Sequence, residues 1–284
     1  NVRKEGTMSD EELKHLANEV RKGIVTGVHA AKSGHPGGSL GATEIMTYLY
    51  FEEMNIDPAD PRRADRDRFV LSKGHCAPAL YAVLAERGFF PKEDLLTLRH
   101  IGSHLQGHPN MNDTPGVDMS TGSLGQGVSA AVGMALAAQH WGDTYRTYAL
   151  LGDGEIEEGQ VWEAAMFAGN HALDNLCLIV DHNGLQIDGT IEEVNSAMPI
   201  ADKFRAFKFH VIEVADGNDF AQLRAAFAEA RETHGMPTCI VCETTKGKGV
   251  SFMEGQVGWH GKAPNDEQYA QAMAELDAHD KEGE

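Results

Sequence analysis

The fold is decided by residues 146–189, RTYALLGDGEIEEGQVWEAAMFAGNHALDNLCLIVDHNGLQIDG, which predict a strand, a turn, a helix, a second strand and a loop. The apolar runs Thr147–Leu151 and Leu176–Val180 are the two strands, and apolar residues recur at roughly helical spacing within Glu155–His171. A helix between two parallel strands forms a right-handed crossover. The crossover brings the carboxyl ends of both strands to one edge of a parallel sheet.

Polar residues follow both strands at this edge. Gly152-Asp153-Gly154 ends the first strand, and Asp181-His182-Asn183-Gly184 ends the second. The glycines beside Asp153 allow positive φ and a close approach of a ligand to the backbone. We expect Asp153 and Asn183 to lie in the crevice where open α/β sheets bind ligands, and to suit a Mg²⁺ ion that keeps substrate phosphates as further ligands. A plain turn that binds no cofactor is the alternative.

The remainder of the chain repeats this pattern without a linker, an internal repeat or a break in composition. It predicts one doubly wound, mainly parallel α/β domain over residues 1–284. Residues 1–9 are expected to be a flexible N-terminus or a tag remnant, and 265–284 a peripheral acidic tail. The other predicted strands are 68–71, 210–214 and 238–243, and the other predicted helices are 10–32, 42–54, 76–87, 199–207, 220–232 and, after an initial glycine loop, 122–139.

Composition limits the classes of partner. A formal net charge of −19 argues against nucleic acid and anionic membrane, because both require a basic surface. No apolar run is long enough for a membrane span, and the start lacks the apolar segment of a secretory signal. The spacing of the four cysteines is not that of disulfide-bonded secreted proteins; they are Cys76, Cys177, Cys239 and Cys242. We therefore expect these residues to be buried, reduced thiols and the protein to be cytoplasmic.

Histidines lie on glycine-rich loops elsewhere in the chain. His35 lies in SGHPGGSLG, residues 33–41, where four glycines and a proline predict a tight, irregular loop. His75 ends the predicted strand 68–71 in SKGH, and should project into the same crevice. The segment 99–127 is too long for a passive connection, and its GHP and TGSLGQG favour a functional loop. A lone histidine is more often structural, but two on loops at one sheet edge favour a functional role.

Eight motifs, taken together and in order, resemble those of transketolases, which use thiamine diphosphate. They are SGHPGGSLGATEI, LSKGH, QGHP, TGSLGQG, GDGEIEEGQVWEA, DHNGLQIDG, KFRAFKFHVIEV and TTKGKGVSF…WHGKAP. The resemblance extends from about Leu16 to Pro264 and implies the diphosphate-binding domain of that family. It also implies transfer of a two-carbon ketol unit from a ketose phosphate to an aldose phosphate, in which the cofactor serves as electron sink.

The resemblance assigns a metal site to the opening stretch. It implies that Asp153, Asn183 and the backbone carbonyl of Leu185 bind Mg²⁺, or Ca²⁺ or Mn²⁺ in its place, and that the cation bridges the diphosphate of the cofactor. The family often has a pair of asparagines here, and His182 takes the first of those places in this chain. Asn183 nevertheless matches the ligand position.

The resemblance also assigns roles to four histidines. His35 and His108 match histidines that face the donor sugar near the reacting carbons. His75 matches one near the diphosphate and the substrate, and His260 matches one that reaches the diphosphate and the sugar hydroxyls. Neutral imidazoles can donate and accept protons at cellular pH, so all four are predicted catalytic residues.

Four further positions complete the predicted site. Gly122 and Leu124 match the segment around the cofactor ring, and Gly154 is a predicted cofactor contact within GDG. Glu158 matches an acid at the subunit interface, in a chain of carboxyl groups that links two active sites. We expect Glu158 to contribute to cofactor binding and catalysis, and the alternative is a solvated acid on a helix face.

The resemblance covers only part of a transketolase. In the family, a second domain supplies the glutamate that triggers deprotonation of the thiazolium ring, and it follows the segment that ends here near HGKAP. We expect the N-terminal subunit of a split transketolase of the pentose phosphate pathway, which is active only with a C-terminal subunit, most simply as an α₂β₂ heterotetramer. The alternatives are a fragment of a longer enzyme, a portion of a 1-deoxyxylulose 5-phosphate synthase, and a non-catalytic binding subunit. The donor and acceptor sugars stay open and include branched or sulfonated ones, because the residues that distinguish such acceptors would lie partly on the other subunit.

Overall fold

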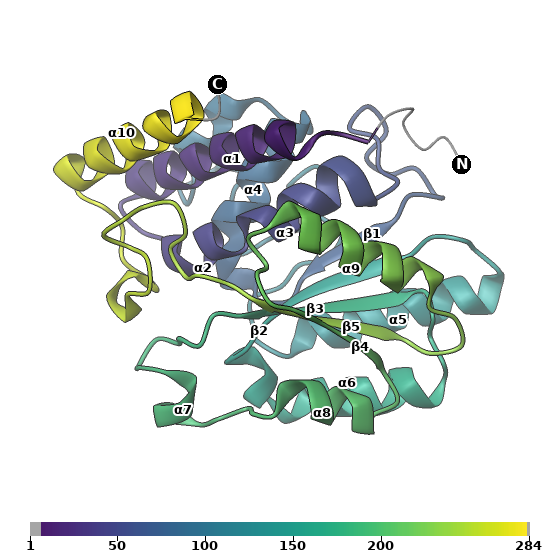
Figure 1. The fold of residues 1–284 in the computed structure, drawn as a ribbon. Helices are drawn as coiled ribbons and strands as arrows, with labels where there is room; N and C mark the ends of the chain where they lie inside the picture. The colour runs from purple at the N-terminus through teal and green to yellow at the C-terminus, as the bar shows by residue number, and fades with distance from the viewer. Residues whose placement is uncertain (1–6, 283–284) are drawn as a thin grey trace.

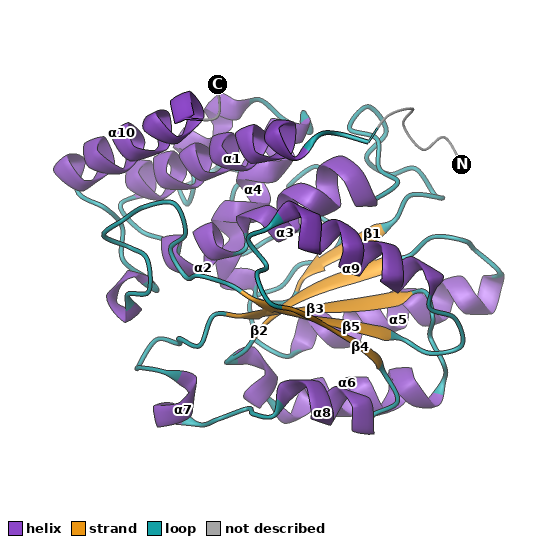
Figure 2. Cartoon of the chain, in the orientation of Figure 1, coloured by secondary structure: helices purple, strands orange, loops and turns teal. Residues whose placement is uncertain are grey.

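A five-stranded sheet forms the centre of the computed structural model, which describes residues 7–282. The strand order is β1-β2-β3-β5-β4, and every neighbouring pair is parallel (Figure 1). Helices cover both faces of the sheet (Figure 2), so the predicted doubly wound, parallel α/β fold is confirmed. The strands are β1 (Arg68–Leu71), β2 (Thr147–Gly152), β3 (Leu176–His182), β4 (His210–Val214) and β5 (Thr238–Glu243).

The helices form two layers around the sheet. They are α1 (Asp10–Ala31), α2 (Pro36–Gly41), α3 (Thr43–Tyr48), α4 (Ala77–Arg87), α5 (Gln126–Trp141), α6 (Gly159–Asn170), α7 (Ile191–Val194), α8 (Ile200–Ala206), α9 (Phe220–Glu232) and α10 (Asp266–Glu282). Figure 1 shows α1, α3, α4 and α9 on one side of the sheet and α5, α6 and α8 on the other. Each face of the sheet packs against one layer of helices and forms a separate hydrophobic core. Because side chains alternate along β2, Tyr148 and Leu150 belong to one core, and Ala149 and Leu151 belong to the other.

The glycine-rich segment 33–41 is the main correction to the predicted fold. Residues Pro36–Gly41 form the short helix α2, with His35 at its N-cap, and not an irregular loop. An added Cβ would lie 2.8 Å from the carbonyl oxygen of Trp259 at Gly37, and 2.9 Å from that of Thr245 at Gly41. Gly37 and Gly41 therefore allow other loops to pack against the helix, whereas Gly34, before the helix, has a positive φ of 148°.

Both ends of the described chain pack on the body of the fold. Residues 1–6 of the predicted flexible segment lie outside the described residues, whereas Ser9 caps α1 in a reciprocal capping box with Glu12. The predicted tail contains α10, which lies beside α1 at the outside of the molecule (Figure 1). Leu276 of α10 is fully buried, and its carbonyl accepts a hydrogen bond from Asn18 Nδ2 at 2.7 Å.

The four cysteines are buried free thiols, as predicted. Cys239 and Cys242 of β5 lie in different cores, on opposite faces of the sheet. Within residues 7–282, no helix has the length and apolar character that crossing a membrane requires.

Candidate functional site

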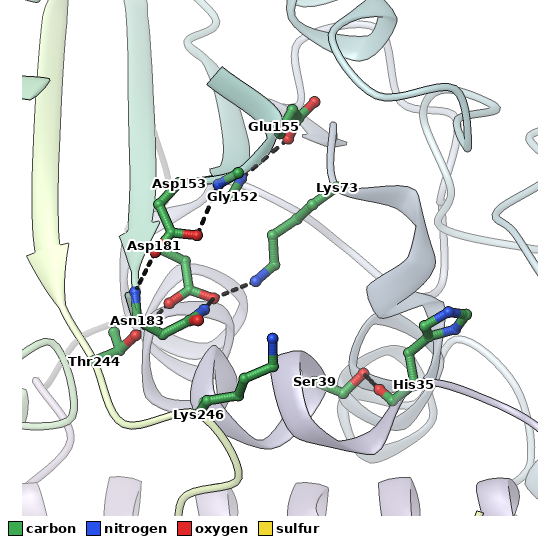
Figure 3. A network of polar contacts seen from close by, with 12 residues as sticks. His35, Ser39, Lys73, Gly152, Asp153, Glu155, Asp181, Asn183, Thr244 and Lys246 are labelled. Carbon is green, nitrogen blue, oxygen red and sulfur yellow. Dashed lines mark hydrogen bonds and ion pairs between the residues drawn. The ribbon is translucent and has the colours of Figure 1, made fainter. Parts of the chain in front are cut away.

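The carboxyl edge of the sheet brings together the two side chains predicted to bind a metal (Figure 3). Asp153 follows β2 and Asn183 follows β3, and Gly152 is in register with Asp181. Asp153 Oδ2 accepts hydrogen bonds from the backbone N–H groups of Asn183 at 2.9 Å and Gly184 at 2.6 Å. Burial, followed by the charge of Asp181, raises the pKa of the Asp153 carboxyl. The predicted proximity of Asp153 and Asn183 is confirmed, and their metal-binding role stays a prediction.

The third predicted ligand, the carbonyl of Leu185, lies in the loop after β3. Asn183 Oδ1 accepts a hydrogen bond from the Leu185 N–H at 3.2 Å, and the Leu185 carbonyl accepts one from Lys246 Nζ at 2.9 Å. No group of three or more His, Cys, Asp or Glu side chains in residues 7–282 could hold a metal ion. A cation here would instead bind one carboxylate, one amide oxygen and one carbonyl oxygen, and such hard oxygen donors fit Mg²⁺.

Two buried lysines at this edge were not among the predicted site residues. Lys73, after β1, is 1% exposed and forms an ion pair with the fully buried Asp181. Burial alone would lower the pKa of Lys73 and raise that of Asp181, but their mutual attraction reverses both directions. Lys246, after β5, is 2% exposed, and burial is the main cause that lowers its pKa. Both lysines belong to the motifs that resemble transketolases, but the sequence does not indicate which lysines are buried.

Three histidines from three loops meet beside these lysines. The ring centroids of His35 and His75 are 5.3 Å apart, those of His35 and His260 are 5.6 Å apart, and those of His75 and His260 are 5.2 Å apart. Burial is the main cause that lowers the pKa of His35 to about 4 and that of His260 to about 3, and it holds the pKa of His75 well below its usual value. The three imidazoles are therefore neutral at pH 7. His260 Nδ1 lies 3.0 Å from Lys246 Nζ. Because an ammonium group can only donate, this contact assigns Nδ1 as the acceptor and the proton of the neutral ring to Nε2.

His108 and the TGSLGQG loop lie against the turn that carries His75. The imidazole of His108 packs on Gly122, where an added Cβ would lie 3.0 Å from the imidazole Cγ. An added Cβ at Gly74 would lie 2.7 Å from the backbone nitrogen of Gly122, so glycine lets the two loops approach closely. Burial is the main cause that lowers the pKa of His108. Leu124 of the same loop is half-buried.

Two acidic residues of the GEIEEG turn have different surroundings. Glu158 is exposed at the N-cap of α6 and packs beside Gly125, outside the histidine cluster. Glu155 is 2% exposed and accepts hydrogen bonds from Ser72 Oγ at 2.5 Å and from the N–H groups of Gly125 and Gly152, both at 3.0 Å. Glu155 therefore holds three loops of the site together, a role that the sequence motifs did not predict. The predicted role of Glu158 at a subunit contact stays a prediction.

Unpaired polar atoms at this edge fit a site that receives a ligand. His35 Nδ1 and Thr121 Oγ1 are buried and have no hydrogen-bond partner, which is rare in folded proteins. Gly154 donates its N–H to Asp153 Oδ1 at 2.8 Å.

Two cavities lie at opposite edges of the sheet. A hollow of about 320 Å³ adjoins Asn183 at the carboxyl edge, and a larger cavity of about 710 Å³, which Arg146 helps to line, lies at the other edge. The chemistry-bearing residues thus gather away from the larger cavity.

Comparison with known proteins gives relatives of about the length of this chain and relatives that are more than twice as long. The chain is 48% identical over 274 residues to the 6-deoxy-6-sulfo-D-fructose transketolase subunit SqwG of Clostridium sp. (strain MSTE9), with 96% of this chain and 98% of that protein covered. It is 44% identical to an apulose-4-phosphate transketolase subunit of Phocaeicola vulgatus, with 95% of both covered. Human transketolase is 46% identical over 253 residues, which cover 88% of this chain and 40% of that protein.

Solved structures and a family profile agree with these relatives. Transketolase from Campylobacter jejuni superposes with a TM-score of 0.89 at 32% identity, over 98% of this chain and 46% of that one. The profile described as "Transketolase, thiamine diphosphate binding domain" matches residues 13–282. The chain therefore belongs to the transketolase family, and residues 13–282 match the thiamine diphosphate binding domain of that family.

Proposed function

We propose that this chain is the N-terminal subunit of a split, thiamine diphosphate-dependent transketolase. It transfers a two-carbon ketol unit from a ketose phosphate to an aldose phosphate, together with a separate C-terminal subunit. The observation that carries the proposal is the meeting of three neutral histidines, His35, His75 and His260, with Asp153 and Asn183 at one sheet edge. The split is supported by relatives named as transketolase subunits, which this chain covers over 95% and 98% of their length.

The metal side of the site holds the cofactor. In this proposal Asp153, Asn183 and the carbonyl of Leu185 bind Mg²⁺, or Ca²⁺ or Mn²⁺ in its place, and Gly154 lies beside the diphosphate. When bound, thiamine diphosphate would supply the nucleophilic carbon and the electron sink for cleavage and formation of the C–C bond. Lys246, which donates to the Leu185 carbonyl, places a cation beside the same anionic group.

The histidine side orients the sugar and moves its protons. His35 and His108 face the donor sugar, and His75 and His260 lie between the sugar and the diphosphate. Because the pKa values of His35 and His260 are about 4 and about 3, both imidazoles are neutral and can accept or donate a hydrogen bond at pH 7. Gly122 packs against His108, and with Leu124 it forms the wall beside the cofactor ring.

The partner completes the site. In the assembled enzyme, most simply α₂β₂, the C-terminal subunit covers the pyrimidine half of the cofactor, and the exposed Glu158 meets a neighbouring subunit. The complex acts in the cytoplasm, a location that four buried, reduced thiols favour.

Activity with and without the partner tests the proposal. The purified chain with thiamine diphosphate and Mg²⁺ should not transfer a ketol unit, whereas the chain mixed with its C-terminal partner should. The donors tested should include xylulose 5-phosphate, 6-deoxy-6-sulfo-D-fructose and apulose 4-phosphate, because the last two appear in the names of two relatives. Turnover by the lone chain would rule out the split site. CO₂ release from pyruvate and glyceraldehyde phosphate would indicate a deoxyxylulose phosphate synthase instead.

The substitution Asp153→Ala separates an enzyme from a binding subunit. It should abolish metal-dependent cofactor binding and the activity of the reconstituted pair. Unchanged binding and activity would indicate a chain that keeps the fold without the chemistry.

A further inference from the structure

We propose that Asp181 is a positioning residue of the metal site, whose carboxylate fixes the amide of Asn183 with its oxygen free for the cation. The inference rests on the proposed function, because it concerns the same metal site. Asp181 is not one of the predicted ligands, although it lies only two residues before Asn183.

The carboxylate of Asp181 joins three strand ends (Figure 3). Oδ2 accepts the ion-pair hydrogen bond of Lys73, which follows β1, and a hydrogen bond from Asn183 Nδ2 at 3.3 Å. Oδ1 accepts a hydrogen bond from the hydroxyl of Thr244, which follows β5. Both oxygens of Asp181 are therefore engaged by donors of this chain, and the residue is fully buried.

These contacts decide which way the Asn183 amide faces. The oxygen and nitrogen of an asparagine amide have nearly the same shape, so only hydrogen bonds set their orientation. An ionised carboxylate can only accept, and Asp181 therefore selects the NH₂ group of Asn183. Oδ1 then points to the other side, where it accepts from the Leu185 N–H at 3.2 Å and keeps a second lone pair. A reversed amide would set oxygen against carboxylate and turn NH₂ donors toward the cation.

Lys73 explains why Asp181 can perform this role without binding the cation itself. A buried carboxylate is costly unless it is paired, and Lys73 supplies the matching charge at 1% exposure. With that pair and the Thr244 hydroxyl, Asp181 keeps its negative charge and has little capacity left for a metal. Asp153 differs, because its hydrogen-bond partners are backbone N–H groups and no ion pair within residues 7–282 neutralises it.

Mn²⁺ binding to the full chain tests the inference. The chain is titrated with Mn²⁺ alone and with thiamine diphosphate present, and free Mn²⁺ is measured by electron paramagnetic resonance. The paired variant Lys73→Met/Asp181→Leu removes both charges together, which is often tolerated in a core. We expect its Mn²⁺ affinity to fall about 10–100-fold, the range found when groups that orient metal ligands are removed. Thr244→Val, which removes only the hydrogen bond on the far oxygen, should change the affinity by less than the lower end of that range, about 10-fold.

A second background separates positioning from a general structural role. Asn183→Asp places a carboxylate at the ligand position, and a carboxylate has no amide to orient. In that background, removal of the Lys73–Asp181 pair should leave Mn²⁺ affinity nearly unchanged, because the pair adds no net charge and position 183 has no amide to orient. A merely structural role would weaken Mn²⁺ binding in both backgrounds.

The outcomes distinguish this inference from the proposed function. If the paired variant binds Mn²⁺ as tightly as the unmodified chain, Asp181 does not position Asn183, and the proposed function stands. The metal site and the inference both fail if the unmodified chain does not bind Mn²⁺, or if Asp153→Ala binds it equally well, with or without thiamine diphosphate. Should circular dichroism show that the paired variant is unfolded, Lys73→Met/Asp181→Ala in both backgrounds also removes both charges and the acceptor of the Asn183 amide, and the same results decide it.

Discussion

The substitution Lys73→Met tests how the buried charges at the sheet edge are balanced. It removes the cation from an ion pair whose residues are 1% and 0% exposed, and it leaves Asp181 with hydrogen bonds from Thr244 and Asn183 only. Breaking a buried pair from one side costs about 3–5 kcal/mol, because the remaining charge is uncompensated. At about 2–4 °C per kcal/mol, the melting temperature should fall by roughly 6–20 °C.

Urea unfolding of the chain at pH 7, followed by circular dichroism, measures this loss. The matched control is Lys14→Met, because Lys14 pairs with Glu11 on the surface, where both side chains are 63% exposed. That variant should lose less than about 1 kcal/mol. The paired variant Lys73→Met/Asp181→Leu should recover most of the loss, since no charge is then buried alone. A loss in Lys73→Met no larger than in Lys14→Met would refute the reasoning.

Two further properties of the chain can be measured directly. Burial lowers the pKa of His35 to about 4 and that of His260 to about 3, below the unfolded value of about 6.5, so their contribution to stability is full above pH 6.5 and is lost as the pH falls toward 4. Urea unfolding between pH 7.5 and 4.5 checks this sign, and imidazole NMR signals of both residues that titrate near pH 6.5 would contradict it. Gly37→Ala should cost about 1–3 kcal/mol, because its Cβ would lie 2.8 Å from the Trp259 carbonyl oxygen. Gly133→Ala on α5, with no atom within 4 Å of the added Cβ, should instead stabilise the chain by about 0.5–1 kcal/mol, and equal effects of the two would exclude a steric cause.

The sequence predicted the elements that obey periodicity and topology rules. The strands β4 and β5 and the helix α9 have the predicted bounds, because apolar spacing and polar flanks mark both of their ends. The proximity of Asp153 and Asn183 also follows from topology, since parallel strands joined by a crossover end at the same edge.

The rest depends on contacts between distant segments. The glycines of α2 read as turn residues, but at Gly37 and Gly41 the absence of a side chain serves packing against residues more than 200 positions away. In GEIEEG the sequence has several acids in a row, and nothing local distinguishes the buried Glu155 from the exposed Glu158. Only the fold shows that Glu155 accepts hydrogen bonds from the Ser72 hydroxyl and the Gly125 N–H, which lie on two other loops.

The charges at the sheet edge explain how so acidic a chain can suit an anionic cofactor. Of the buried charged groups there, Lys73 and Asp181 neutralise each other, and their ion pair adds no net charge. Glu155 accepts hydrogen bonds from the Ser72 hydroxyl and two backbone N–H groups. Asp153 and Lys246 remain, and no ion pair joins either of them to an opposite charge among the described residues. A carboxylate for a divalent cation and an ammonium for a diphosphate thus lie at one edge, with Leu185 bonded to the ammonium and predicted to meet the cation. The net charge of −19 counts every charged residue of the chain, whereas anion binding in the proposed site depends on this local pair and on the proposed cation.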